Sequence, residues 1–405
     1  MRVAIAHDFL CQRGGAERVV LYLASILDNA FIVTSVHSPE ATYPELASVE
    51  VRASRVVGAE RARRFRRHVL SYPGVFRSAD LSDADFVIVS SSAFAHHVHH
   101  ERSVVYWHTP PRFLYDPGAY LPVRRGSLMD AFASRGARVG LAPLRRSDGR
   151  AARAHLGHAA NSERTAAKLR AVYGIEPAVL HPPLDTGRLA GPLSPLPASP
   201  RALVVSRLLP YKGVDVAIAA CRQLELPLTV VGIGPDEGRL RSLAGGTADF
   251  AGTLSDDELA AVFRQSSVVL CPGADDFGYI PLEAGFCGRP VVALRGSGAA
   301  ESVIAGETGE LVDGWDEASW SSAVRGVLDS SWDPERLRIA ASRFDGASFC
   351  AAFAEWISEW VDLSEVLSAS ALGAIQHSGS TPEEMSKSSQ AERPGLRPAS
   401  PPLGL

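Results

Sequence analysis

The sequence predicts an α/β protein built from two doubly wound, Rossmann-like domains. Its 405 residues exceed the roughly 250 to 300 at which a single hydrophobic core stops growing. Short apolar segments alternate with segments of helical periodicity, which is the pattern of parallel sheets covered by helices. A proline-rich run over residues 182–200 separates two such series. We therefore expect an N-terminal domain over residues 1–181, this linker, and a C-terminal domain over residues 201–345.

Composition and charge exclude several classes of protein. Hydrophobic residues make up 46% and charged residues 21%, as in ordinary globular proteins, and the net charge of −4 argues against general nucleic-acid binding. The five cysteines are scattered, without zinc or redox spacing, which favours a reducing cytoplasm. No apolar run approaches the roughly 20 residues of a membrane span, and the N-terminus is too short for a signal peptide. Abundant arginine and alanine, with only three lysines, suggest a GC-rich bacterial genome.

The N-terminal domain is expected to begin with a buried strand over residues 2–6, a turn at Gly14 and Gly15, and a helix. Backbone N–H groups at such a turn, together with the helix dipole, can meet a phosphate. The turn lacks the full GxGxxG pattern, which counts against a dinucleotide-dependent dehydrogenase. Further strands are expected over residues 31–36, 85–89 and 104–107.

Two histidine-containing segments follow. The run at residues 95–100, AHHVHH, invites a metal site, but no suitably spaced carboxylate accompanies it, so a solvated helix end is the favoured interpretation. His108 stands at the carboxyl end of the strand at 104–107 and precedes two prolines. A histidine there suits donor contact or proton handling, whereas a histidine satisfied in the core is the common alternative.

Arginine-rich stretches at residues 61–67 and 112–155 interrupt the alternation of strands and helices. Basic amphipathic segments attract anionic membrane surfaces and phospholipid-linked acceptors. Solvated arginine-rich helices would explain them equally well. Peripheral contact with the inner face of the plasma membrane is therefore an expectation alongside a cytoplasmic location.

The C-terminal domain is expected to open with a strand over residues 202–205 and a turn over residues 206–213 that carries Arg207 and Lys212. An arginine fork and a lysine point charge suit a diphosphate that gains charge as its sugar leaves. Surface ion pairing is the alternative role. Strands at 228–231 and 249–250 end in loops that carry Gly232 and Leu254.

Residues 270–301 show the pattern of a strand, an acidic loop, a helix and a second strand. Asp275 and Asp276 follow the first strand, at the edge where ligands of open α/β sheets bind, and Glu283 lies on the helix. Ionised carboxylates only accept hydrogen bonds, and the hydroxyls of a polyol donate them well. Acids that only solvate a loop are the alternative, which the third carboxylate and the neighbouring glycines disfavour.

The segment from Asp275 through Asp276, Phe277 and Gly278 to Glu283 resembles the EEDFGIVPLEA signature of retaining glycosyltransferases of family 4, which have the GT-B fold. In this family the first acid holds the donor sugar and the second holds the ribose. The resemblance implies these roles for Asp275 and Glu283, although the first acid here is Asp rather than Glu.

Two further segments carry the same resemblance. SRLLPYKG at residues 206–213 is similar to SRLxPxKG, whose Arg and Lys neutralise the donor diphosphate in the family. HTPPRFLYD at residues 108–116 resembles the HTPxRY segment of a subgroup in which many members use GDP-mannose, which implies that His108 lies in the donor site. The loops that follow residues 231 and 252 are similar to the family's nucleotide-side loops.

The resemblance covers residues 1–361 and implies a retaining hexosyltransferase. It would move mannose from GDP-mannose to a glycan or a polyprenyl- or lipid-linked acceptor in cell-envelope polysaccharide or glycolipid synthesis. No metal or other cofactor is implied, since the basic turn already supplies charge. The implied catalytic residues are His108, Arg207, Lys212 and Asp275, and the implied donor-binding residues are Gly14, Gly15, Gly232, Leu254, Asp276, Phe277, Gly278 and Glu283.

Two other functions remain open: a GT-B sugar-nucleotide epimerase, and a catalytically silent partner that binds a sugar nucleotide.

The C-terminal part of the chain carries predictions about the fold and none about the site. Aromatic residues at helical spacing predict a helix over about 346–362, and in GT-B proteins such a helix crosses back onto the N-terminal domain. Residues 368–405 lack apolar periodicity, so a disordered tail is expected.

Overall fold

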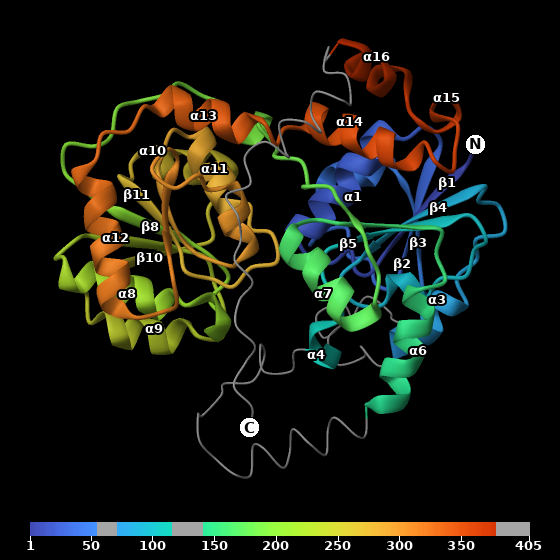
Figure 1. The fold of residues 1–405 in the computed structure, drawn as a ribbon, viewed down its shortest axis with the longest axis horizontal. Helices are drawn as coiled ribbons and strands as arrows, with labels where there is room; N and C mark the ends of the chain where they lie inside the picture. The colour runs from blue at the N-terminus through green and yellow to red at the C-terminus, as the bar shows by residue number, and fades with distance from the viewer. Residues whose placement is uncertain (55–70, 116–140, 378–405) are drawn as a thin grey trace.

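The protein folds into two α/β domains that lie side by side (Figure 1). The structure is a computed structural model and describes residues 1–54, 71–115 and 141–377. Each domain contains one sheet whose neighbouring strands pair in parallel. This architecture confirms the predicted fold class of two doubly wound, Rossmann-like domains.

The N-terminal domain has a seven-stranded sheet in the order β3-β2-β1-β4-β5-β6-β7. Its central strands are buried along their whole length because helices cover both faces, which explains their continuous apolar sequence. The strands are β1 (Val3–His7), β2 (Ala30–Thr34), β3 (Glu50–Ala53), β4 (Phe86–Ser91), β5 (Ser103–Trp107), β6 (Gly157–Ala160) and β7 (Ala178–Val179). The helical segments are α1 (Gly15–Ile26), η1 (Pro44–Ser48), α3 (Tyr72–Arg77), η3 (Ala95–His97), α4 (Arg112–Tyr115), α6 (Ala142–Ala152) and α7 (Glu163–Tyr173).

The C-terminal domain has a six-stranded sheet in the order β10-β9-β8-β11-β12-β13. Its strands are β8 (Ala202–Val205), β9 (Leu228–Val231), β10 (Ala248–Gly252), β11 (Val268–Cys271), β12 (Val291–Leu294) and β13 (Gly309–Val312). The helical segments are η5 (Gly187–Leu189), η6 (Pro210–Lys212), α8 (Val214–Gln223), α9 (Glu237–Ala244), α10 (Asp256–Arg264), α11 (Ile280–Phe286), η7 (Gly298–Ser302), α12 (Glu317–Asp329) and α13 (Pro334–Ser342).

In each sheet the strand order reverses beside the first strand of its domain, between β1 and β4 and between β8 and β11. Such a reversal opens a crevice at the carboxyl ends of the two strands, because their connections leave in opposite directions. Both crevices are therefore natural ligand sites, and the segments that follow β5, β8 and β11 lie around them.

Three more helices continue the chain beyond α13, namely α14 (Gly346–Ile357), α15 (Leu363–Val366) and α16 (Ala369–His377). Phe349, Phe353 and Ile357 of α14 are buried in the same cluster as Val3 and Leu23 of the N-terminal domain. Figure 1 shows α14 on the N-terminal domain beside α1, while α13 belongs to the C-terminal domain, where it packs against α11. The chain therefore returns to its first domain after completing the second.

Helix α16 lies within the range that was expected to be disordered. Ala371 is 5% exposed, and Leu372 and Ile375 pack against the N-terminal core. The expectation is therefore wrong for residues 369–377, because a few apolar residues on one helical face suffice to dock a segment this short. Residues 378–405 lie outside the described residues.

The proline-rich stretch at 182–200 also packs more closely than a free linker. Leu184 and Leu189 are buried in a core cluster of the C-terminal domain.

The arginines at 61–67 and those between 116 and 140 fall outside the described part of the chain. No helix within residues 1–54, 71–115 or 141–377 is both long and apolar enough to cross a membrane.

Candidate functional site

The acidic loop after β11 lies at the carboxyl edge of the C-terminal sheet, opposite the basic turn after β8. The carboxylate of Asp275 forms an ion pair with the ammonium group of Lys212. The side chain of Lys212 is 13% exposed and that of Asp275 is 26% exposed. The strands β8 and β11 are parallel neighbours, so their carboxyl ends bring together a cation and an acid that are 63 residues apart in the chain.

Asp276 faces the other domain. Its carboxylate is 9% exposed and accepts hydrogen bonds from Arg112, at 3.0 Å from Nε, and from Lys168. Burial by itself opposes ionisation, but the two cations outweigh it and hold the pKa of Asp276 below its usual range. The hydroxyl of Ser162 donates to the backbone oxygen of Asp276 at 2.6 Å. Asp276 therefore joins the two domains.

Glu283, on α11, is buried and ion-paired to two arginines. Arg18 Nη1, from α1 of the N-terminal domain, lies 3.1 Å from Glu283 Oε1, and Arg188 binds the same oxygen. Hence both acids that the family resemblance singles out, Asp275 and Glu283, lie within ion-pair distance of cationic side chains.

Two glycines determine the path of the acidic loop. A Cβ on Gly298 would lie 1.9 Å from the backbone oxygen of Asp276, and the Gly298 N–H donates to the oxygen of Asp275 at 2.8 Å. Gly278 has a φ of 89°, a left-handed conformation that glycine adopts without strain. Phe277, which directly precedes Gly278, is 4% exposed and packs in the domain core, so it anchors the loop.

The Gly14-Gly15 turn meets the acidic loop across the domain boundary. A Cβ on Gly15 would lie 2.6 Å from the ring of Tyr279, whose hydroxyl contacts the Gly15 oxygen at 3.4 Å. Gly14 lies against Glu17, because a Cβ at Gly14 would be 2.4 Å from Glu17 Oε2. The turn predicted to meet a phosphate is thus at the boundary between the two domains.

His108 directly follows β5 and is 8% exposed. Its Nε2 atom lies 2.8 Å from the hydroxyl of Ser90, at the end of β4. Burial lowers the pKa of His108 to about 3. Electrostatic repulsion from His7 lowers this pKa further, and attraction to Asp276 raises it in part. His108 is therefore a neutral imidazole near neutral pH.

The remaining predicted residues lie at the ends of the neighbouring strands. Arg207 follows β8, is exposed, and has no ion pair within the described part of the chain. Gly232 follows β9 with a φ of 125°, and a Cβ there would lie 2.0 Å from the oxygen of Ser206. Leu254 follows β10 and is half-buried. These loops surround the same sheet edge as Lys212.

Sequence reasoning missed most of the cations that meet the acids: Arg18, Arg112, Lys168 and Arg188. One signal was available, because Lys168 is among only three lysines in the chain. It also missed Glu301, whose carboxylate accepts the N–H groups of Glu163 and Arg164 at 2.8 and 2.9 Å. Glu301, on η7, thereby accepts hydrogen bonds from backbone N–H groups in the first turn of α7, which have no partner within that helix.

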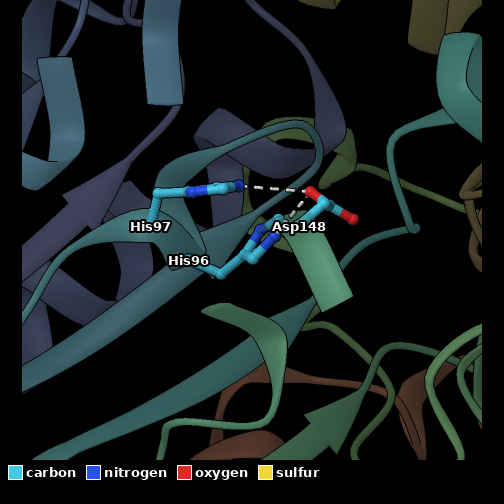
Figure 2. Close-up of side chains that lie close together, drawn as sticks. All are labelled: His96, His97 and Asp148. Atoms are coloured by element: carbon cyan, nitrogen blue, oxygen red, sulfur yellow. Dashed lines mark hydrogen bonds and ion pairs between the residues drawn. The ribbon is translucent and has the colours of Figure 1, made fainter. Parts of the chain in front are cut away.

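The histidine run contains a buried cluster rather than the expected solvated helix end. Figure 2 shows His96 and His97 directed at Asp148 of α6, with Nε2 atoms 3.0 and 3.3 Å from Asp148 Oδ1. Tyr115 and Tyr173 donate to Asp148 Oδ2 at 2.8 and 2.7 Å. The sequence could not reveal this carboxylate, which lies 51 and 52 residues beyond the two histidines.

The three side chains carry metal-ligand atoms within 4.8 Å of one another, but their bonding favours a hydrogen-bond cluster. His97 Nδ1 lies 3.1 Å from a guanidinium nitrogen of Arg77, which can only donate, so the ring proton belongs on Nε2. That proton then points at Asp148 and occupies the lone pair that a metal would need. Four donors thus satisfy one buried carboxylate and keep the pKa of Asp148 low despite its burial.

Comparisons with known proteins agree with this fold. Residues 195–344 match the family model described as glycosyl transferases group 1. D-inositol 3-phosphate glycosyltransferase 2 of Catenulispora acidiphila is 31% identical over 242 residues, which is 50% of this chain and 56% of that protein. A GDP-mannose-dependent alpha-(1-6)-phosphatidylinositol monomannoside mannosyltransferase of Mycolicibacterium smegmatis is 34% identical over 187 residues, 42% and 48% of the two chains.

The chain thus spans about half, or less, of the curated relatives it matches. Two solved structures extend the likeness in fold to both domains. Anabaena HepE in complex with UDP has a TM-score of 0.64 at 18% identity, covering 89% of this chain and 100% of its own. Sucrose-phosphate synthase from Thermosynechococcus elongatus has a TM-score of 0.63 at 15% identity, covering 89% and 99%. This chain therefore has the GT-B fold, and its residues 195–344 are similar to the glycosyl transferases group 1 family.

Proposed function

We propose that this protein transfers a hexose from a nucleotide-diphosphate donor to a hydroxyl group of an acceptor, with retention of the anomeric configuration. The observation that carries the proposal is the charge around the two crevices. Four carboxylates and five cationic side chains are ion-paired there, which leaves an excess of one positive charge. The carboxylates are Asp256, Asp275, Asp276 and Glu283, and the cations are Arg18, Arg112, Lys168, Arg188 and Lys212. Such an excess attracts a diphosphate of opposite charge.

The two sites of positive charge at the C-terminal sheet have different tasks in this proposal. Lys212 is held by Asp275, so its ammonium group is already positioned beside the acidic loop. Arg207 is exposed and has no ion-pair partner in the described ranges, so it is free to take a phosphate. Both stabilise charge that grows on the leaving diphosphate as the bond between the sugar and the phosphate oxygen breaks.

Asp275 and Glu283 would accept hydrogen bonds from the hydroxyls of the donor. In this proposal Asp275 holds the sugar and Glu283 holds the ribose, after Lys212 and Arg18 have shifted toward the phosphates. The Gly14-Gly15 turn adds backbone N–H groups from the N-terminal domain, at the start of α1. The acceptor oxygen attacks the anomeric carbon on the face from which the nucleoside diphosphate departs.

We further propose that the donor is GDP-mannose and that the acceptor is a glycan or a polyprenyl- or lipid-linked alcohol, used at or near the inner face of the membrane. The HTPPR segment at residues 108–112 and the mycobacterial mannosyltransferase relative support mannose. The residues around the crevices supply cationic charge without a metal, so the proposed mechanism requires none.

Thermal unfolding in the presence of GDP-mannose, GDP-glucose, UDP-glucose and UDP-galactose tests the donor. A ligand that binds the folded state raises the melting temperature with the logarithm of its excess over Kd. We expect GDP-mannose to give the largest increase, and equal responses to all four sugars would contradict the donor assignment.

Nucleotide release, measured with and without lipid-linked acceptors, then tests the reaction. Acceptor-dependent release of GDP with an α-linked product supports a retaining transferase. Release without any acceptor would instead indicate an epimerase. Binding without any release would indicate a silent sugar-nucleotide-binding protein.

A further inference from the structure

Three buried polar side chains form a continuous chain at the carboxyl ends of β1, β4 and β5. His7 Nδ1 lies 3.1 Å from the backbone oxygen of Ser90 and 3.1 Å from its hydroxyl. The same hydroxyl lies 2.8 Å from His108 Nε2. His7 and Ser90 are 1% and 0% exposed, so water does not compete for these contacts.

The backbone oxygen of Ser90 determines the direction of the protons in this chain. A carbonyl oxygen can only accept a hydrogen bond, so His7 Nδ1 must carry a proton. The Ser90 hydroxyl is then placed to accept from His7, and its own proton points to its other neighbour, His108 Nε2. This leaves His108 Nε2 as an acceptor.

The second nitrogen of His108 follows from the first. A neutral imidazole has one donor and one acceptor nitrogen, and burial keeps His108 neutral by lowering its pKa to about 3. With Nε2 as the acceptor, the proton belongs on Nδ1. No hydrogen-bond partner of this Nδ1 is found among the described residues, so it is available to a ligand in the crevice.

We propose that His7 and Ser90 are positioning residues that fix the tautomer of His108 so that it presents an Nδ1–H donor to the substrate. His108 would then donate to an oxygen of the sugar nucleotide, and it has no lone pair on that side with which to remove a proton from the acceptor. The identity of that substrate rests on the function proposed above, whereas the tautomer itself does not.

The other charged groups near the chain do not reverse its direction. Glu17 Oε1 lies 3.9 Å from His7 Nε2 and accepts a hydrogen bond from Gln12 at 2.8 Å. If Glu17 promoted protonation of His7, the new proton would enter at Nε2, and Nδ1 would still donate to Ser90. Asp276 favours a positive His108 but does not overcome burial.

The tautomer can be measured by nitrogen NMR on the full chain labelled with ¹⁵N-histidine. We expect His108, assigned with a His108→Asn variant, to show a protonated Nδ1 and an unprotonated Nε2. His97 serves as an internal reference, since its contacts with Arg77 and Asp148 require the opposite tautomer. A protonated Nε2 on His108 would overturn the proposal, whether or not the protein has transferase activity.

Substitution of Ser90 tests the cause. In Ser90→Ala, His108 Nε2 loses its donor, so we expect a mixture of the two tautomers and a fall in kcat/KM of about tenfold. Ser91→Ala is the matched control, because the neighbouring hydroxyl lies 2.9 Å from Nδ1 of His96 in the buried cluster. It should leave the His108 signals unchanged.

The measurements separate the two proposals. An unchanged His108 tautomer in Ser90→Ala would refute the role of Ser90, even if turnover falls. The expected tautomers in a protein without turnover would support the chain of hydrogen bonds and refute the transferase function. If Ser90→Ala does not fold, the tautomer of the unmodified protein still decides.

Discussion

Asp276→Asn should loosen the contact between the two domains. Asp276 is the common partner of Arg112 and Lys168, both from the N-terminal domain, and its carboxylate is 9% exposed. The substitution keeps the shape of the side chain but removes the negative charge that Arg112 and Lys168 share. Removing one partner of a buried pair costs about 3 to 5 kcal/mol. Since Arg112 and Lys168 are 13% and 28% exposed, we adopt the lower figure.

A cost of about 3 kcal/mol raises the population of molecules in which the two domains have separated at this contact roughly 150-fold. Hydrogen exchange at the amides of Glu163 and Arg164 reports this opening directly. Both N–H groups donate to Glu301 of the other domain, so they are protected when the domains are together. We therefore expect their exchange to accelerate by up to that factor, while amides in the centre of each sheet exchange as before.

Asp275→Asn is the matched control for this experiment. It makes the same chemical change one residue earlier, but Asp275 pairs with Lys212 of its own domain. Exchange at Glu163 and Arg164 should therefore remain unchanged in this variant. Equal acceleration in both variants, or none in Asp276→Asn, would refute the view that Asp276 holds the domains together.

Three further results are expected. Lys212→Ala and Arg207→Ala should each raise the barrier to transfer by about 3 to 4 kcal/mol with little change in melting temperature, so near-normal turnover would remove their assignment to the diphosphate. Asp275→Asn should nearly abolish transfer in steady-state kinetics while Asp275→Glu retains part of it, and full activity of the Asn variant would exclude the proposed role. Chemical denaturation should show stability falling below pH 6.5, because burial lowers the pKa of three histidines from 6.5 to about 3 or 4. Below pH 6.5 the unfolded chain binds protons that the folded chain does not, so the free energy of unfolding falls by about 2 kcal/mol per histidine at pH 5. A free energy of unfolding that stays constant between pH 7 and pH 5 would contradict this. The histidines are His108, His155 and His158.

The regular elements could be predicted where local signals agree with burial. The strands at 202–205 and 228–231 have the predicted bounds, because apolar runs between turn residues are typical of sheets covered on both faces. Helix α7 has equally clear local signals, since Ser162 caps its start and Gly174 adopts the left-handed conformation at its end. The edge strand β3, with the sequence EVRA, gave no such signal because its residues are partly exposed.

The candidate site was predictable only in its local parts. The acids and the basic turn follow strands, so their place at a sheet edge could be read from the sequence. Their partners could not, because Arg18 and Glu283 are 265 residues apart and belong to different domains. Similarly, Asp276 was expected to bind the donor, yet in this structure its carboxylate is engaged by two cations of the other domain.

The return of the chain to its first domain has a consequence for synthesis. The N-terminal core includes Phe353 and Ile357, so residues 1–181 alone would leave apolar surface uncovered on the ribosome. The C-terminal domain has its complete sheet once β13 has emerged, and it can fold as a unit before the domain that precedes it in sequence. We expect a nascent chain to need protection of its N-terminal half until α14 appears, and a fragment containing residues 182–345 to be the more soluble of the two halves.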